Sequence, residues 1–187
     1  DTTNSLVKVG TEQVSSTFLI KEFSSFGLVP VAGSHMVLPS NPSAHFGTTT
    51  TEENLGTGTD PDTSKDMSAG GDSAQWTGLL WYLPNAITID AVHVFMASLG
   101  TPASALNYHL MSYDIDTTNG ATSGDLSSGA VLADGSAISG VDRTAIDYQS
   151  FTIQSSDVAS GKVIFATMES DTTQSISVNM TVKYHIQ

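Results

Sequence analysis

The stretch that decides the fold is ISVNMTVKYHI, residues 176–186. Apolar and polar side chains alternate along all eleven positions, with Ile, Val, Met and Tyr on the even numbers and Ser, Asn, Thr, Lys and His on the odd ones. Successive side chains of an extended strand point to opposite faces. The pattern therefore predicts a long strand with one face in a core and the other towards water or a partner.

Further runs with strand character lie upstream, separated by turns rich in Gly, Ser, Asn and Asp. They are rich in β-branched and aromatic residues, as strands are. The predicted strands are 76–83, 87–96, 106–115, 130–138, 145–154 and 162–169.

The run ITIDAVHVFM at 87–96 changes phase in its middle. Ile87 and Ile89 share one face, whereas Val92 and Val94 lie in the opposite phase. One extra residue in a strand reverses the face of every side chain that follows. We therefore expect a β-bulge near Asp90.

These strands predict the fold class. Short strands without a sustained period of 3.6 residues indicate an all-β antiparallel sandwich, for which a jelly roll is the preferred topology. The first part of the chain differs, because only 16–26 and 27–38 resemble strands and 40–74 is a long polar tract. We expect an extended N-terminal arm at 1–75, which orders against a neighbouring subunit, and a β-sandwich domain at 76–187.

Composition excludes several partners. The formal net charge is −13, from 19 acidic and 6 basic side chains, which disfavours nucleic acid and anionic membrane surfaces. No apolar run approaches the roughly 20 residues that span a bilayer. Only 13% of the residues are charged, so Ser, Thr, Asn, Gln and Gly must cover much of the surface. There are no cysteines, and hence neither disulfides nor thiolate metal sites.

Motifs for catalysis are missing. No GxSxG element marks a nucleophile, and the histidines show neither HxH nor HExxH spacing, although His93, His109 and His185 fall on predicted strands. One interpretation of these histidines is a metal site shared by two neighbouring strands. The alternative is that they lie on polar, solvent-facing sides of the strands. We predict no enzyme, no catalytic residues and no cofactor.

Calcium is the best-supported metal candidate. Asp114, Asp116, Asn119 and Asp125 place oxygen ligands in one loop, with Gly120 to turn it. The spacing departs from the EF-hand loop, which needs glycine at about position 6 and a bidentate Glu at about position 12. The competing interpretation is a hairpin closed by Asn119-Gly120, a dipeptide that favours tight turns.

Aromatic residues offer a possible contact surface. Trp76, Trp81 and Tyr82 are the candidates for binding a ligand or a neighbouring subunit. Because Trp81 and Tyr82 are adjacent on a strand, they point to opposite faces, and at most one of them is interior. The alternative is that such residues fill a core.

From Trp76 onward the segments resemble a β-sandwich domain of virion structural proteins from marine tailed bacteriophages, of the tail-fibre or capsid-surface decoration type. The segments that carry the resemblance are GLLWYLPNAITIDAVHVF (78–95), LNYHLMSYDIDTTNG (106–120), GDLSSGAVLA (124–133), SSDVASGKVIFATMES (155–170) and SVNMTVKYHI (177–186). The resemblance implies an oligomer, with a trimer as the expected form, and transfers no catalytic residues.

Two functions follow as hypotheses. The first is a non-enzymatic structural component of a bacteriophage virion, located at the particle surface, whose partners are copies of itself and other virion proteins. The alternative is an extracellular glycan-binding module or adhesin, with calcium assisting, whose partner is a host surface glycan.

Overall fold

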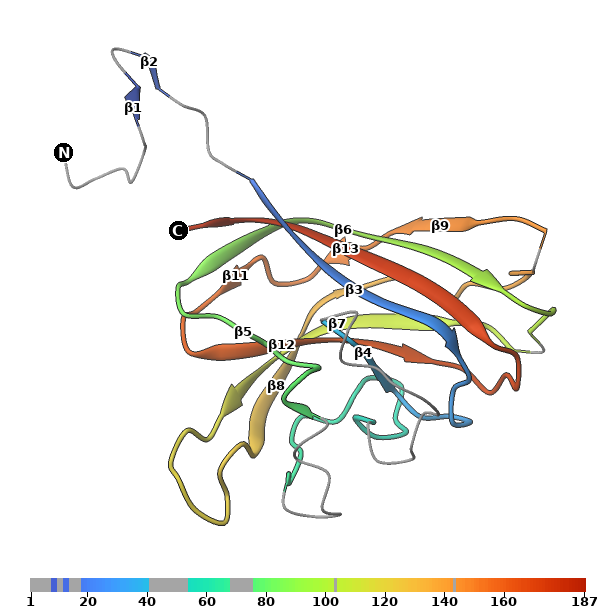
Figure 1. The fold of residues 1–187 in the computed structure, drawn as a ribbon, viewed down its shortest axis with the longest axis horizontal. Helices are drawn as coiled ribbons and strands as arrows, with labels where there is room; N and C mark the ends of the chain where they lie inside the picture. Colours follow the sequence, from blue (N-terminus) through green and yellow to red (C-terminus); the bar gives the residue numbers. More distant parts are fainter. Residues whose placement is uncertain are drawn as a thin grey trace.

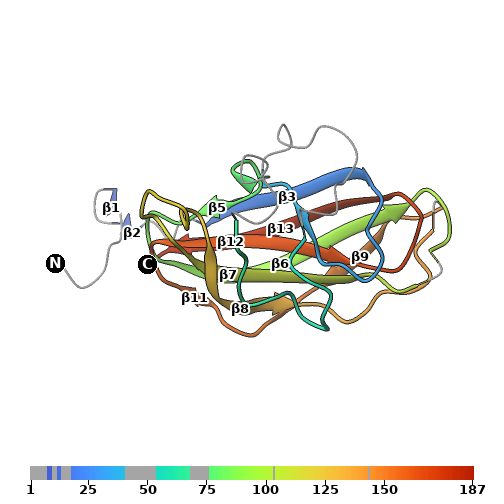
Figure 2. The ribbon, with the colours of Figure 1, turned by 90° about the horizontal axis from the view of Figure 1, so that it is seen from below.

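The computed structural model describes residues 8–9, 12–13, 18–40, 54–67, 76–102, 104–142 and 144–187. Two antiparallel sheets are stacked face to face (Figures 1 and 2). A third ladder joins β1 (Lys8–Val9) to β2 (Glu12–Gln13) and pairs with neither large sheet. The chain is thus an all-β sandwich, as the sequence predicts.

One sheet, which we term the open sheet, has three long strands at its centre. Their order is β3 (Leu19–Leu28), β13 (Ile176–Ile186) and β6 (Ile87–Ser98). Two short strands extend it by pairing with different parts of β6; they are β9 (Asp147–Ser150) and β11 (Asp157–Val158).

The other sheet, which we term the covered sheet, is built around β12 (Lys162–Glu169). On one side β12 pairs with β4 (Met36–Leu38) and β5 (Trp81–Tyr82). On its other side follow β7 (Asn107–Ile115), β8 (Leu126–Asp134) and β10 (Thr152–Ile153).

The connections between the sheets make a jelly roll. The strand order is β3-β13-β6-β9 in the open sheet and β4-β12-β7-β8 in the covered sheet. Along these eight strands the chain passes from one sheet to the other at every step except β7 to β8, which is the double Greek-key arrangement of that topology. The predicted topology is confirmed.

The predicted bulge lies where the phase of 87–96 changes. Lys183 of β13 faces Ala91, and the next residue, Tyr184, faces Ile89. Asp90 is therefore the extra residue of β6. The bulge lets Ile89 and Val92 both point into the core although they lie three positions apart.

A large apolar core fills the space between the sheets. The open sheet contributes Phe23, Val94 and Met180, and the covered sheet contributes Tyr108 and Ile164, all of them buried. Burial of this apolar surface is the main driving force for folding.

A second core lies on the outer face of the covered sheet. Segments 54–67 and 76–80 lie over this face, and the path of the first can be followed in Figure 2. Their apolar side chains Leu55, Met67, Trp76 and Leu79 are buried against it. Its members are Val37, Leu55, Met67, Trp76, Leu79, Met111, Tyr113, Leu126, Val163 and Phe165. The crossing is close: a Cβ on Gly129 would lie 2.7 Å from the Cα of Thr63, so only glycine fits there.

The structure differs from the predicted division into an arm at 1–75 and a sandwich at 76–187. β3 forms the edge of the open sheet and β4 pairs with β12, so both belong to the sandwich. Residues 54–67 cover its outer face. Of the rest of the predicted arm, the structure describes β1, β2 and residues 18, 29–35 and 39–40, and the remainder lies outside the described residues.

Candidate functional site: an apolar groove on the open sheet

The outer face of the open sheet carries a shallow apolar groove. Its volume is about 280 Å³. The groove is lined by Ser25, Phe26, Phe95, Met96, Ala97, Ile146, Ser177, Val178 and Asn179, which come from β3, β6, β13 and the approach to β9.

The register of the strands builds this groove. Asn179 of β13 lies between Ser24 of β3 and Phe95 of β6, and Phe95 faces Tyr148 of β9. Short side chains on β13 form the floor, and larger apolar side chains rise on both sides. The exposed fractions of the wall residues are 86% for Phe26, 47% for Phe95 and 75% for Ile146, and Tyr148, which lies beside the groove, is 55% exposed.

A bulge in β3 presents Phe26. Ser25 and Leu28 are three positions apart along β3, whereas their partners Val178 and Ile176 are only two positions apart on β13. Gly27 takes φ +72°, a left-handed conformation that glycine adopts without strain, and its N–H donates to the Ser177 hydroxyl at 3.4 Å. Ser25 and Leu28 thereby both stay buried while Phe26 points to solvent.

Phe95, in the opposite wall, is the first of a row of three rings that continues with Tyr148 and His93. The Tyr148 ring lies 5.0 Å from the Phe95 ring and 5.7 Å from the His93 ring, with an angle of 25° between the planes of the Tyr148 and His93 rings. The Tyr148 hydroxyl contacts His93 Nδ1 at 2.9 Å. These contacts join Tyr148 to both Phe95 and His93 beside the groove.

The groove is poor in acidic groups although the chain is strongly acidic. Around it, the outward positions of β6, β9 and β13 are Phe95, Ala97, Tyr148, Ser177 and Asn179. On the same outer face, Glu22 lies in the row of Thr181 and His93, next to that of Asn179 and Phe95, and Asp90 lies further along the sheet. The residues that line the groove include no Asp or Glu.

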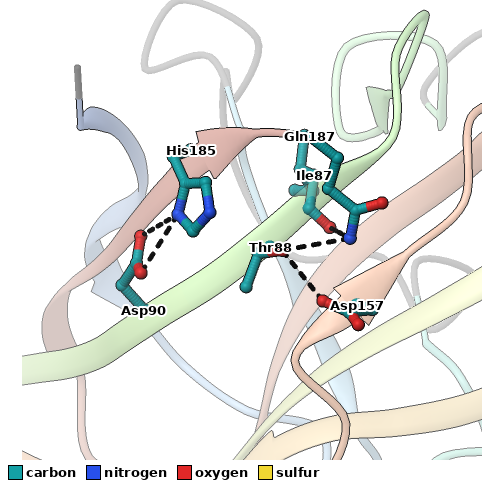
Figure 3. A network of polar contacts seen from close by, with 6 residues as sticks. All are labelled: Ile87, Thr88, Asp90, Asp157, His185 and Gln187. Atoms are coloured by element: carbon teal, nitrogen blue, oxygen red, sulfur yellow. Dashed lines mark hydrogen bonds and ion pairs between the residues drawn. The ribbon is translucent and has the colours of Figure 1, made fainter. Parts of the chain in front are cut away.

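The other end of this face carries a polar network (Figure 3). The Asp90 carboxylate contacts His185 Nδ1 at 3.0 Å, and Thr88 donates to Asp157 at 2.8 Å. The bulge in β6 aims Asp90 at His185. A Ser-His-Asp hydrolase requires a nucleophile hydrogen-bonded to the second imidazole nitrogen, and within the described part of the chain His185 Nε2 has no hydrogen-bond partner. The pair ties the end of β13 to β6.

The predicted calcium ligands lie in and beside the hairpin between β7 and β8, where most are engaged by protein donors. Asp116 accepts from the Thr118 N–H and the Thr122 hydroxyl, and these bonds hold its pKa below the usual range. Asp114 pairs with Lys162 Nζ at 2.8 Å. The Asp125 carboxylate accepts from the Met67 N–H, which ties the hairpin to segment 54–67. Calcium binding here remains a hypothesis.

The predicted aromatic contact residues take three different positions. Trp76 is 4% exposed and packs edge-on against Phe165 in the second core. Trp81 points into the main core between Phe23 and Tyr184. Tyr82 points outward and is 46% exposed, in agreement with the opposite faces expected of this adjacent pair. Sequence reasoning missed Phe26, Phe95, Ile146 and Tyr148.

Among the residues that the structure describes, no three His, Asp or Glu side chains are grouped to hold a metal ion. The described residues also include no helix with the length and apolarity to cross a bilayer.

Comparisons with known proteins give the following result. No family model matches the chain, and no curated protein matches it. A structure of infectious bursal disease virus, Gx strain, is similar over 96% of this chain at 9% identity, with a TM-score of 0.37. The chain spans 36% of the length of that protein. A structure of the empty head of turnip yellow mosaic virus is similar over 98% of this chain and 88% of its own, at 12% identity and a TM-score of 0.23.

Proposed function

We propose that this chain is a non-enzymatic structural component of a virion, which assembles by packing the apolar groove of one copy against another copy. The observation that carries the proposal is the exposed wall of the groove. A soluble monomer rarely leaves several large apolar side chains contiguous on one sheet face, because covering them with a partner is favourable. The jelly-roll topology supports the proposal, since this architecture recurs in viral capsid domains.

The charge distribution favours a second copy as the occupant. Two chains with a net charge of −13 repel each other over most of their surfaces. They can meet most favourably where Asp and Glu are sparse, and the groove is such a place. The groove is also self-complementary, because Phe26 is a projecting knob beside a hollow of about 280 Å³. In such a contact, the Phe26 of one copy enters the hollow of the next copy.

The finer assignment follows the sequence resemblance. A capsid decoration protein or a domain of a tail or head fibre of a bacteriophage, at the particle surface, is the expected role. The expected partners are copies of the chain, in a trimer, together with other virion proteins. A trimer requires a heterologous contact, in which Phe26 of each copy enters the groove of the next, and the ring of three closes.

The test is the mass of the full chain in solution by light scattering, with and without a calcium chelator. We expect a multimer whose mass is unchanged by chelation and whose population falls at least tenfold in the Phe26→Ser and Ile146→Ser variants. Ile20→Ser is the matched control, because Ile20 is outward-facing on β3 and 57% exposed but lies outside the groove. A wild-type chain that stays monomeric at high concentration overturns the proposal.

A glycan-binding module is the second candidate. The observation that favours it is the row of His93, Tyr148 and Phe95, because exposed ring faces can stack on sugar rings. This function requires no multimer. It predicts that wild-type monomer binds oligosaccharides on a glycan array and that Tyr148→Ala loses this binding, whereas Phe26→Ser retains it.

A further inference from the structure

A polar cavity of about 640 Å³ opens on the outer side of the covered sheet, beside segment 54–62. We term this segment the strap. The cavity is lined by residues of the strap, of β7 and β12, and of the end of β8; these are Thr57, Gly58, Thr59, Asp60, Asn107, His109, Asp134, Gly135 and Glu169. Its volume lies within the range of about 300–1,000 Å³ that is usual for sites of small ligands.

The register of the covered sheet brings two carboxylates to this cavity. Asp134 of β8 lies directly opposite His109 of β7. Glu169 of β12 lies directly opposite Asn107, two positions before His109 on the same strand. Directly opposed residues share a face of a sheet, as do residues two positions apart on one strand. Both carboxylates therefore lie on the face that lines the cavity, on either side of β7.

The strap adds a third carboxylate. The His35 N–H donates to the Gly56 carbonyl and the Leu55 N–H donates to the His35 carbonyl, each at 2.9 Å. The His35 ring places Nε2 at 2.9 Å from the Gly58 carbonyl oxygen. These contacts hold the strap against the sheet, so that Asp60 lines the cavity.

The lining residues do not neutralise these carboxylates. None of them is Lys or Arg. The Asn107 amide donates to Glu169 at 2.6 Å, and this neutral donor leaves the negative charge in place. Burial lowers the pKa of the His109 imidazole, so the ring adds no positive charge at neutral pH. The cavity therefore has a negative potential that attracts cations.

His109 forms the floor of the cavity. It is the only buried residue of the lining, and its side chain is 8% exposed. Its Nε2 faces the Asp60 carboxylate at 3.4 Å, and a carboxylate only accepts, so Nε2 carries the proton and Nδ1 is an acceptor. That Nδ1 has no hydrogen-bond partner among the described residues, although buried polar atoms usually have one. The floor and the walls thus both favour a ligand that donates hydrogen bonds.

We propose that this cavity binds an organic cation with several N–H donors, either an alkylammonium or a guanidinium group. Charge-assisted hydrogen bonds from such a group to carboxylates are about twice as strong as neutral ones. A metal ion fits less well, because no three His, Asp or Glu side chains of the described residues are grouped to ligate one. A free polyamine and the basic side chain of a partner protein share this chemistry. The site is independent of the apolar groove, which lies on the open sheet.

The test is an NMR titration of the full chain at neutral pH and low salt with two probes, spermidine and acetyl-arginine methylamide. We expect the amide signals of 57–60, Asp134 and Gly135 to shift with a one-to-one binding curve, whereas the central amides of β6 and β13 stay in place. The probe that binds more tightly identifies the source of the cation. Spermidine stands for a free polyamine, and the arginine derivative stands for a side chain of a partner.

Asp60→Asn, Asp134→Asn and Glu169→Gln are the informative variants, because each removes one charge but keeps the shape and an accepting oxygen. Each should weaken binding of the tighter probe by about three- to tenfold. Asp116→Asn, in the hairpin between β7 and β8, is the matched control; it changes the net charge equally outside the cavity and should leave the affinity unchanged. A titration in which neither probe shifts the cavity signals at high millimolar concentration overturns the proposal. Equal weakening by Asp116→Asn also overturns it, because the probes then respond only to the overall charge of the chain.

Discussion

The two sheets of the sandwich share one core but differ on their outer faces. The covered sheet is buried on both sides, and its strands β7 and β12 are accordingly buried along almost their whole length. The open sheet is buried on one side, and β13 alternates between buried and half-exposed positions. In this fold the outer face of a sheet can thus be covered by the protein's own chain or left exposed for another molecule. The burial pattern along the strands shows which of the two applies.

The difference between the two outer faces should have its largest effect on the free energy of unfolding when a large side chain is truncated. Phe165→Ala removes a fully buried ring on the covered face, where it packs against Trp76 and Tyr113 at centroid distances of 5.5 and 5.9 Å. We expect a loss of about 3–5 kcal/mol in the free energy of unfolding by urea. Phe95→Ala, the matched aromatic truncation on the open face, should cost no more than about 1 kcal/mol in the monomer. Equal losses would mean that the open face is also buried in the isolated chain.

The periodicity of the sequence accounts for the fold but not for the second core. The unbroken alternation of 176–186 and the phase change at Asp90 both translate directly into β13 and the bulge of β6. Each of these two features depends only on which side chains of a single strand face the core. The covering of the other sheet depends on segment 54–67, whose Leu55 and Met67 are single apolar residues in a polar tract. Their burial follows from tertiary packing, which local patterns do not specify.

The groove shows a second limit of predicting the structure from the sequence. Ile146 and Tyr148 alternate with Asp147 and Gln149, so a strand is predicted correctly at β9. Alternation alone does not say which phase is buried, and here the apolar phase faces solvent. The phase of Phe95 contained the missing signal: with Val92, Val94 and Met96 pointing inward, Phe95 must point outward. Two outward aromatic residues on paired strands are a recognisable surface feature once the pairing is known.

Two buried tyrosines, one in each core, allow a comparison in which the expected effects on stability are of intermediate size. Burial raises the pKa of both Tyr108, in the main core, and Tyr113, in the second core. The Tyr113 hydroxyl donates to the Asp62 carbonyl at 2.8 Å, whereas the Tyr108 hydroxyl has no partner among the described residues. We expect Tyr113→Phe to cost about 1 kcal/mol and Tyr108→Phe to be neutral or stabilising, measured by urea unfolding at pH 7.

The same pair predicts the behaviour of the protein in alkali. Each hydroxyl keeps its proton in the folded state above the ordinary tyrosine value of about 10, whereas the unfolded chain loses it. Stability should therefore fall as the pH rises through 10, and less steeply in the Tyr108→Phe/Tyr113→Phe double variant. If the wild type and the double variant respond alike above pH 10, the tyrosines do not control this transition.

The smallest expected effect lies in the polar network of the open face. The Asp90 and His185 side chains are 23% and 31% exposed, so solvent screens their contact. A double-mutant cycle of Asp90→Ala and His185→Gln should give a coupling of about 0.5 kcal/mol at low salt and less at 1 M salt. Asp90→Ala retains the extra residue of the bulge, so the register of β6 is kept and Val92 stays in the core. A coupling above about 2 kcal/mol would show that this end of the open face is shielded from water. The outer face of the open sheet would then be shielded from water like that of the covered sheet, except at the groove, where the large apolar side chains remain exposed to solvent.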